Sequence, residues 1–83
     1  MGGNTVTVRF FAGAARAMGT RELVVELAEP VPLGDLVADL GSDPERARIL
    51  GLCTWLVDTR HASDADPVAP GATVDALPPF AGG

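Results

Sequence analysis

The residues with the clearest potential for chemistry stand at the C-terminal end, which reads PPFAGG over residues 78–83. Gly82 and Gly83 have no Cβ atom, so this end could thread a channel that is too narrow for other residues. The reacting group would be the α-carboxylate of Gly83, a poor electrophile until it is activated, most simply by adenylation with ATP. The sequence contains no Gly-rich phosphate loop, HExxH or GxSxG motif, so the activation must come from a partner enzyme. The pattern predicts a carried substrate with no active site of its own.

The residues before the two glycines are suited to project them. Pro78 and Pro79 cannot donate to a strand ladder, and a Pro-Pro pair favours extended polyproline geometry. Six residues at about 3.3 Å each reach roughly 20 Å, enough to enter the cleft of another protein. Residues 1–77 are therefore expected to form a folded domain and residues 78–83 a projecting tail. Phe80 either closes the edge of the sheet or fills an apolar pocket of the partner.

Two strands are predicted near the start of the chain. Residues 5–10 and 21–27 both alternate apolar and polar side chains, which is the period of a half-buried strand. The side chains expected in the core are Val6, Val8, Phe10, Leu23, Val25 and Leu27. Residues 12–20 are small and flexible and are expected to form a connection with about one helical turn, so that the two strands make a hairpin.

Helices are predicted in the middle of the chain. Apolar residues at positions 33, 36, 37 and 40 share one face of a helix, with Pro32 at its first position and Gly41 just past its end. Asp43 is suited to cap a second short helix that turns Ile49 and Leu50 inward.

Strands return in the second half. Residues 52–57 and 73–77 are predicted strands, and residues 59–70 a loop with one short strand at most. Pro70-Gly71 predicts a turn before the last strand. The order strand, strand, helix, strand, strand is α+β and matches the β-grasp, or ubiquitin-like, fold: a mixed sheet of four to five strands with one main helix packed across it. In that fold the first and last strands lie side by side in the middle of the sheet.

Composition limits the function further. The chain has 83 residues and a net charge of −5, which fits one small domain and argues against nucleic acid as a partner. No apolar run approaches the roughly 20 residues of a membrane span, and no export signal is recognised at the start. Cys53 is the only cysteine and His61 the only histidine, so we expect no internal disulfide, no structural zinc site and a reducing, cytoplasmic location.

Several stretches resemble the MoaD/ThiS family of ubiquitin-like sulfur carriers, and most of all its MoaD branch, the small subunit of molybdopterin synthase. They are VTVRFFAGAAR, LGDLVADLG, CTWLVD and GATVDALPPFAGG, and they span nearly the whole chain. The resemblance implies that an E1-like adenylating enzyme (MoeB/ThiF-like) activates Gly83. A sulfur donor such as a desulfurase or rhodanese then converts it to a thiocarboxylate.

The resemblance also implies roles for the tail. The charged tail would enter the large subunit of molybdopterin synthase (MoaE-like), or another sulfur-accepting synthase, with Gly82 and Ala81 in a channel and Phe80 anchored in an apolar pocket. No cofactor would be bound: ATP is used by the activating enzyme, and sulfur is carried covalently at Gly83. Two features depart from the family pattern, namely Ala76 before LPP and the stretch Thr59-Arg60-His61.

Some alternatives stay open. The sulfur acceptor could instead be thiazole (in thiamine synthesis), cysteine or a sulfur-containing natural product. Gly83 could be joined to lysines of target proteins, as in ubiquitin-like modifiers, or the chain could be a plain interaction module. Phe11 belongs either to an apolar docking patch or to a small cluster under residues 12–20.

Other residues are given structural interpretations. Cys53 is expected to behave as a small hydrophobic residue. Trp55 is expected in the core or on the sheet surface, and His61 in a solvent-facing loop. Asp64 and Asp66 are expected to be solvated loop acids, because they lack the ligand pattern of a calcium loop.

Overall fold

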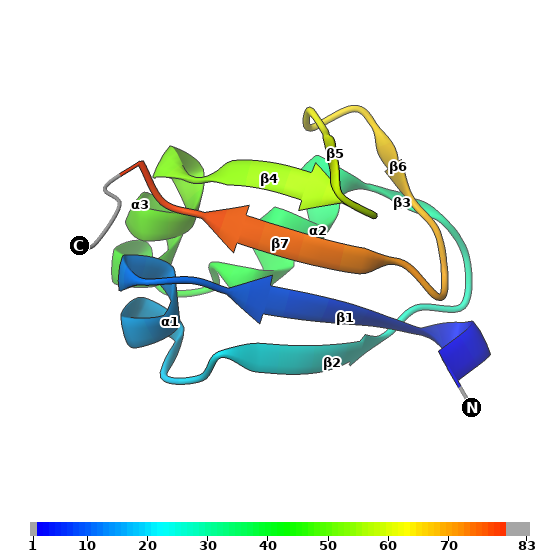
Figure 1. Cartoon of the computed structure of the whole chain (residues 1–83), viewed down its shortest axis with the longest axis horizontal. Helices are drawn as coiled ribbons and strands as arrows, with labels where there is room; N and C mark the ends of the chain where they lie inside the picture. Colours follow the sequence, from blue (N-terminus) through cyan, green and yellow to red (C-terminus); the bar gives the residue numbers. More distant parts are fainter. Residues whose placement is uncertain (1, 80–83) are drawn as a thin grey trace.

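The computed structural model describes residues 2–79 of the chain. A five-stranded mixed sheet carries the helices on one face, and a separate pair of very short strands lies beyond one end of it (Figure 1). The strands of the main sheet are β1 (Thr5–Phe10), β2 (Glu22–Glu26), β4 (Thr54–Val57), β5 (Arg60–His61) and β7 (Thr73–Leu77). The small pair is β3 (Val31–Pro32) with β6 (Pro67–Val68), and a 3-10 turn η1 (Gly2–Asn4) precedes β1. The predicted α+β, β-grasp class is confirmed.

The centre of the sheet joins the two ends of the folded chain. The strand order is β2-β1-β7-β4-β5, with β1 antiparallel to β2 and parallel to β7. Val8 lies opposite Val74 in the register, and both side chains are fully buried. The predicted placing of the first and last strands is therefore confirmed, and β7 is held by a neighbour on each side.

Three helices cover the sheet: the predicted main helix, the predicted second short helix, and a third in the stretch that was expected to form a connection. They are α1 (Gly13–Met18), α2 (Leu33–Leu40) and α3 (Pro44–Leu52). The stretch predicted as a connection with one turn forms the six-residue α1, which ends at Gly19 with a φ of 75°. Pro32 is the N-cap of α2 rather than its first residue, and Gly41 is its C-cap. Asp43 caps α3 as predicted, because its carboxylate accepts a hydrogen bond from the Glu45 N–H (2.8 Å).

The predicted strand over residues 52–57 was too long. Leu52 is the last residue of α3 and Cys53 its C-cap, so β4 begins at Thr54. The following loop contains two strands of two residues each, where one short strand at most was expected. The turn at Pro70-Gly71 is confirmed: Gly71 has a φ of 92°, and the Ala72 N–H donates to the Ala69 carbonyl (3.1 Å).

The core lies between the helices and the sheet. Val6, Val8 and Phe10 are buried as predicted, together with Leu33, Leu36, Leu40, Leu50, Trp55, Val68, Ala72, Val74 and Ala76. Leu23, Val25 and Leu27 are only half-buried, because β2 is an edge strand with a neighbour on one side. None of the helices within residues 2–79 is long and apolar enough to cross a membrane.

A two-residue turn between β4 and β5 offers a direct test of backbone strain. Asp58 and Thr59 have φ values of 49° and 70°, the paired left-handed conformation that a hairpin of this length prefers and that suits glycine. Thr59→Gly is expected to raise the free energy of unfolding by about 1 kcal/mol, because a β-branched residue is strained there. Thr54→Gly, at an exposed position within β4, should lower it. Urea unfolding of both variants measures the difference; a loss of stability in Thr59→Gly would contradict the assignment.

Candidate functional site

The base of the predicted tail is fixed by β7. Ala76 is fully buried, Leu77 pairs with Thr54, and the chain then leaves the sheet at Pro78, which is half-buried, and Pro79, which is exposed. The strand ladder ends here because neither proline has a backbone N–H that could donate a hydrogen bond. The predicted site residues Phe80, Ala81, Gly82 and Gly83 lie outside the described residues, and their roles stay predictions.

Phe11 lies beside the base of the tail. Its N–H donates to the carbonyl of Ala76 (3.3 Å), which places the end of β1 next to the end of β7. Its side chain is 39% exposed and does not belong to the hydrophobic core cluster. Both alternatives for Phe11, a docking patch and a small cluster under residues 12–20, therefore stay predictions. Phe11 lines a shallow hollow of about 460 Å³ together with Arg9, Phe10, Ala12, Ala15, Arg21 and Glu22.

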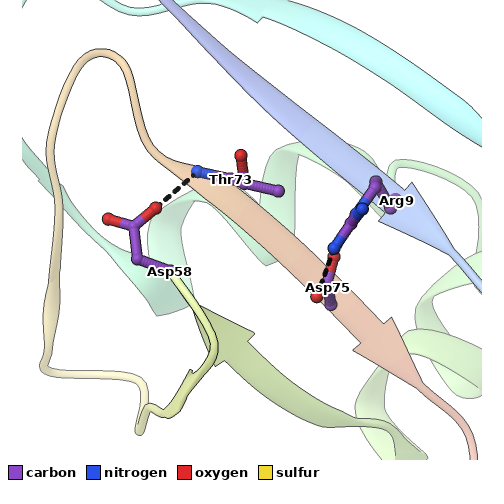
Figure 2. Close-up of polar contacts among 4 residues, drawn as sticks. All are labelled: Arg9, Asp58, Thr73 and Asp75. Carbon is purple, nitrogen blue, oxygen red and sulfur yellow. Dashed lines mark hydrogen bonds and ion pairs between the residues drawn. The ribbon is translucent and has the colours of Figure 1, made fainter.

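A partly buried ion pair, which sequence reasoning missed, ties β1 to the middle of β7. Arg9 and Asp75 are opposite each other in the parallel register, and the guanidinium binds the carboxylate through both oxygens, Nε to Oδ1 at 2.7 Å and Nη2 to Oδ2 at 3.0 Å (Figure 2). The Asp75 side chain is 8% exposed and that of Arg9 45% exposed. The hydrogen bond and the charge of Asp75 raise the pKa of Arg9. This two-point contact holds the two central strands in register just before the tail.

The opposite end of β7 is fixed by the strained turn. The Asp58 carboxylate accepts a hydrogen bond from the Thr73 N–H (2.9 Å), as Figure 2 shows. The Asp58 N–H in turn donates to the Thr73 carbonyl (2.8 Å). The N-terminal end of β7 is thus held by Asp58 and its middle by the ion pair with Arg9, in addition to the strand ladders. These contacts fix the position of β7, the strand that leads into the tail, relative to the rest of the sheet.

Cys53 lies on the other side of the tail base, one residue before Thr54. It is half-buried, and its thiol donates to the carbonyl of Ile49 (Sγ to O, 3.4 Å). Burial raises the pKa of the Cys53 thiol, which keeps it protonated and poorly nucleophilic. The structural interpretation of this residue therefore agrees with its surroundings.

Cys53 should react slowly in the folded protein. Alkylation at pH 8 is expected to be roughly tenfold slower or more than in the urea-unfolded chain, because the thiol is partly covered and protonated. A raised pKa in the folded state also means that stability is complete below the unfolded thiol's pKa and declines as the pH rises through the folded value. Cys53→Ala should remove that alkaline decline. Equal alkylation rates in the two states would contradict this account.

The remaining candidates take ordinary positions. Trp55 is buried, and its indole Nε1–H donates to the Leu50 carbonyl (3.2 Å). His61 is exposed in β5. Asp64 and Asp66 are exposed, and the Asp66 carboxylate accepts a hydrogen bond from the Ser63 N–H (2.8 Å). Within residues 2–79, no group of three or more histidine, cysteine, aspartate or glutamate side chains could hold a metal ion.

Comparison with models of known protein families shows the family of this chain. The model of the ThiS family matches residues 8–83. The chain belongs to the ThiS family. The match includes the second half of β1 and all of β7, which lie side by side in the centre of the sheet. No match was found among curated proteins.

Solved structures share the fold of this ThiS-family chain. SAMP1 from Haloferax volcanii is 25% identical with a TM-score of 0.76, over 95% of this chain and 99% of that one. Urm1 from Trypanosoma brucei is 23% identical with a TM-score of 0.74, over 96% of each chain. In a complex of subunits 1 and 2 of the molybdopterin-converting factor from Helicobacter pylori, the matching chain is 24% identical with a TM-score of 0.68, over 95% of this chain and 99% of that one. The chain thus has the fold of the ubiquitin-like sulfur carriers.

Proposed function

We propose that this chain is a sulfur carrier that uses the α-carboxylate of Gly83 and acts in the cytoplasm in molybdenum cofactor biosynthesis. A partner enzyme joins the carboxylate to the α-phosphorus of ATP and releases pyrophosphate. Sulfide then attacks the acyl carbon and AMP leaves, so that Gly83 ends as a thiocarboxylate. The chain itself is the co-substrate and supplies no catalytic group.

The family match that runs to Gly83 is the observation that carries this proposal. The matched segment includes the Pro-Pro lead and the two glycines, so the resemblance does not stop at the folded domain. The name of the Helicobacter pylori neighbour, a molybdopterin-converting factor in complex with its subunit 2, supports the choice of pathway and of a large-subunit partner.

The geometry suits such a carrier. The tail starts from a central strand with neighbours on both sides, so the base of the tail keeps a fixed direction while residues 80–83 reach into a partner. Phe11 offers an exposed apolar side chain beside that base. In the proposed complex, Phe80 fills an apolar pocket and Ala81 and Gly82 pass through a channel.

Intact-mass spectrometry tests the carrier chemistry. The purified chain is incubated with ATP, an E1-like activating enzyme and a sulfide source. The expected result is a mass gain equal to the exchange of one oxygen for one sulfur, located in the C-terminal peptide. Co-purification with a molybdopterin synthase large subunit then tests the pathway, and binding to a different synthase in its place would move the proposal to another sulfur acceptor, such as thiazole.

Protein modification is the second candidate. It is favoured by the likeness to the Haloferax volcanii protein, which another structure of the same protein names small archaeal modifier protein 1. Conjugation would join Gly83 to lysine side chains of target proteins through an amide bond, with loss of AMP from the same acyl adenylate. It predicts adducts of higher mass in a cell extract supplied with ATP. Their absence, together with thiocarboxylate formation, would leave sulfur transfer as the function.

A further inference from the structure

The outer edge of β2 is the longest open strand edge of the sheet. Within the part of the chain that the structure describes, β2 pairs only with β1, and Figure 1 shows no element beyond it. The opposite edge is formed by β5, which has only two residues and offers little backbone to pair with. An open edge can accept an additional strand from another chain.

The hydrogen-bond pattern identifies which backbone groups face outward. The Phe10 N–H donates to the Arg21 carbonyl (2.9 Å), and the Leu27 N–H donates to the Asn4 carbonyl (2.7 Å). In an antiparallel pair the bonded positions alternate, so odd-numbered residues of this segment face β1 and even-numbered ones face away. The residues whose backbone groups face outward are Glu22, Val24 and Glu26.

One of these three positions is already satisfied. The Thr20 hydroxyl donates to the Glu22 carbonyl (2.9 Å) and accepts a hydrogen bond from the Glu22 N–H (3.3 Å). Thr20 therefore closes the N-terminal part of the edge. Val24 and Glu26 remain, which offer two N–H and two C=O groups at the spacing that an added strand needs.

The side chains beside these open backbone groups do not protect the edge from pairing, as side chains on an open strand edge usually do. Val24 is 61% exposed, more than any other large hydrophobic side chain in residues 3–79. Glu26 is exposed and makes no ion pair with any described residue, whereas Glu22 lies opposite Arg9 in the register. On the helix side, Leu23 and Val25 are left half-buried.

We propose that this edge binds an extended segment of a partner protein as an additional strand centred on Val24 and Glu26. The segment carries an apolar residue opposite Val24 and a basic residue opposite Glu26, because that arrangement covers the exposed valine and neutralises the unpaired carboxylate. Its alternate residues are apolar, since they extend the half-buried surface of Leu23 and Val25. This inference is independent of the chemistry proposed for Gly83.

A second copy of this chain fits the edge poorly. In a two-fold antiparallel pairing centred on Val24, Glu22 of one copy would stand directly opposite Glu26 of the other. Like charges in direct cross-strand positions are destabilising. The edge is also two strands away from β7 in the order β2-β1-β7, so a strand added there leaves the base of the tail uncovered.

Nuclear magnetic resonance titration of the full chain tests the proposal. The probe is the capped peptide acetyl-Thr-Lys-Leu-Val-Leu-Lys-Thr-amide, which carries lysine on both sides of a central valine and so serves either strand direction. Chemical-shift changes are expected to centre on residues 20–27, with slowed amide exchange at Val24 and Glu26. An antiparallel added strand bonds the N–H of the central valine to the Val24 carbonyl, so in that direction the same peptide with an N-methylated central valine should bind much more weakly.

Charge variants supply the matched comparison. Glu26→Lys is expected to weaken binding of the lysine peptide by about fivefold or more, since an attraction becomes a repulsion. Glu29→Lys changes the net charge equally at an exposed position outside β2 and should leave binding within about twofold. Thr20→Ala frees the Glu22 backbone groups and should strengthen binding. The spectrum of each free variant reports whether it is folded.

Three outcomes of the peptide titrations would overturn the proposal. They are shift changes confined to the tail base or to the helices, equal effects of Glu26→Lys and Glu29→Lys, and absence of any change at millimolar peptide. Concentration-dependent dimerisation of the free chain with protection of Val24 would assign the edge to a second copy instead, and would also contradict it.

Discussion

An alanine added after Gly83 is expected to reduce thiocarboxylate formation by more than about a hundredfold while the folded domain keeps its stability. The extra residue moves the carboxylate along the chain by about 3.5 Å. A misplacement of about 1 Å at a reacting centre can already cost roughly a hundredfold in rate. The measurement is the initial rate of thiocarboxylate formation by intact mass, with urea unfolding in parallel.

The N-terminal glycine pair provides the control for this experiment. A Cβ atom at Gly3 would meet no other atom within 4 Å, so Gly3→Ala adds a methyl group without a clash. This variant should form the thiocarboxylate at the unmodified rate. A tail-extended variant that is fully active would refute the carrier function, because no other carboxylate is proposed to react.

Leu50→Ala is expected to lower the free energy of unfolding by about 3 kcal/mol. Leu50 is fully buried near the end of α3, where it packs in the core cluster and its carbonyl accepts the indole N–H of Trp55. A chain of this length has a total stability of about 4–12 kcal/mol, so the loss would be a large fraction of it. Removing the side chain leaves a cavity that the surrounding structure fills only in part.

The same helix supplies the matched control. Leu52 is 51% exposed, and Leu52→Ala should change the free energy of unfolding by about 0.5 kcal/mol or less. Urea unfolding of the two variants, followed by the fluorescence of Trp55, gives the comparison. Similar midpoints would mean that α3 does not pack as described here.

The strands at the two ends of the domain could be predicted because their pattern is local. Residues 5–10 and 73–77 alternate or run apolar over a whole strand, and the bounds of both were correct. Helix α1 and the end of α3 were harder to predict. In α1 only Ala14 is fully buried, so the segment shows no apolar face to read. The run from Leu52 was assigned to a strand because a short apolar run fits a strand or the end of a buried helix equally well.

The ion pair between Arg9 and Asp75 was not predicted from the sequence. Both residues occupy the polar side of a predicted strand, and the predicted fold placed these two strands side by side. Only the register was missing, and the register sets which residues face each other across 66 positions of the chain. The same limit applied to Phe11, whose place beside Ala76 follows from that register.

The tail residues were recognised from composition and order, which carry no information about their neighbours. Proline and glycine have fixed backbone consequences, so the end of the ladder at Pro78 could be anticipated. The surroundings of that point, with Phe11 on one side and Cys53 on the other, arise from contacts between distant segments. Such contacts depend on the whole fold.

The position of β7 between β1 and β4 has a consequence for biosynthesis. While the ribosome is still making the chain, the sheet lacks its middle until residues 73–77 have emerged. The earlier segments can form the β1–β2 and β4–β5 hairpins, the β3–β6 pair and the helices, but the two hairpins cannot be joined into one sheet before β7 is present. Completion of the sheet, which also fixes Leu77 at the base of the tail, therefore occurs in one late step.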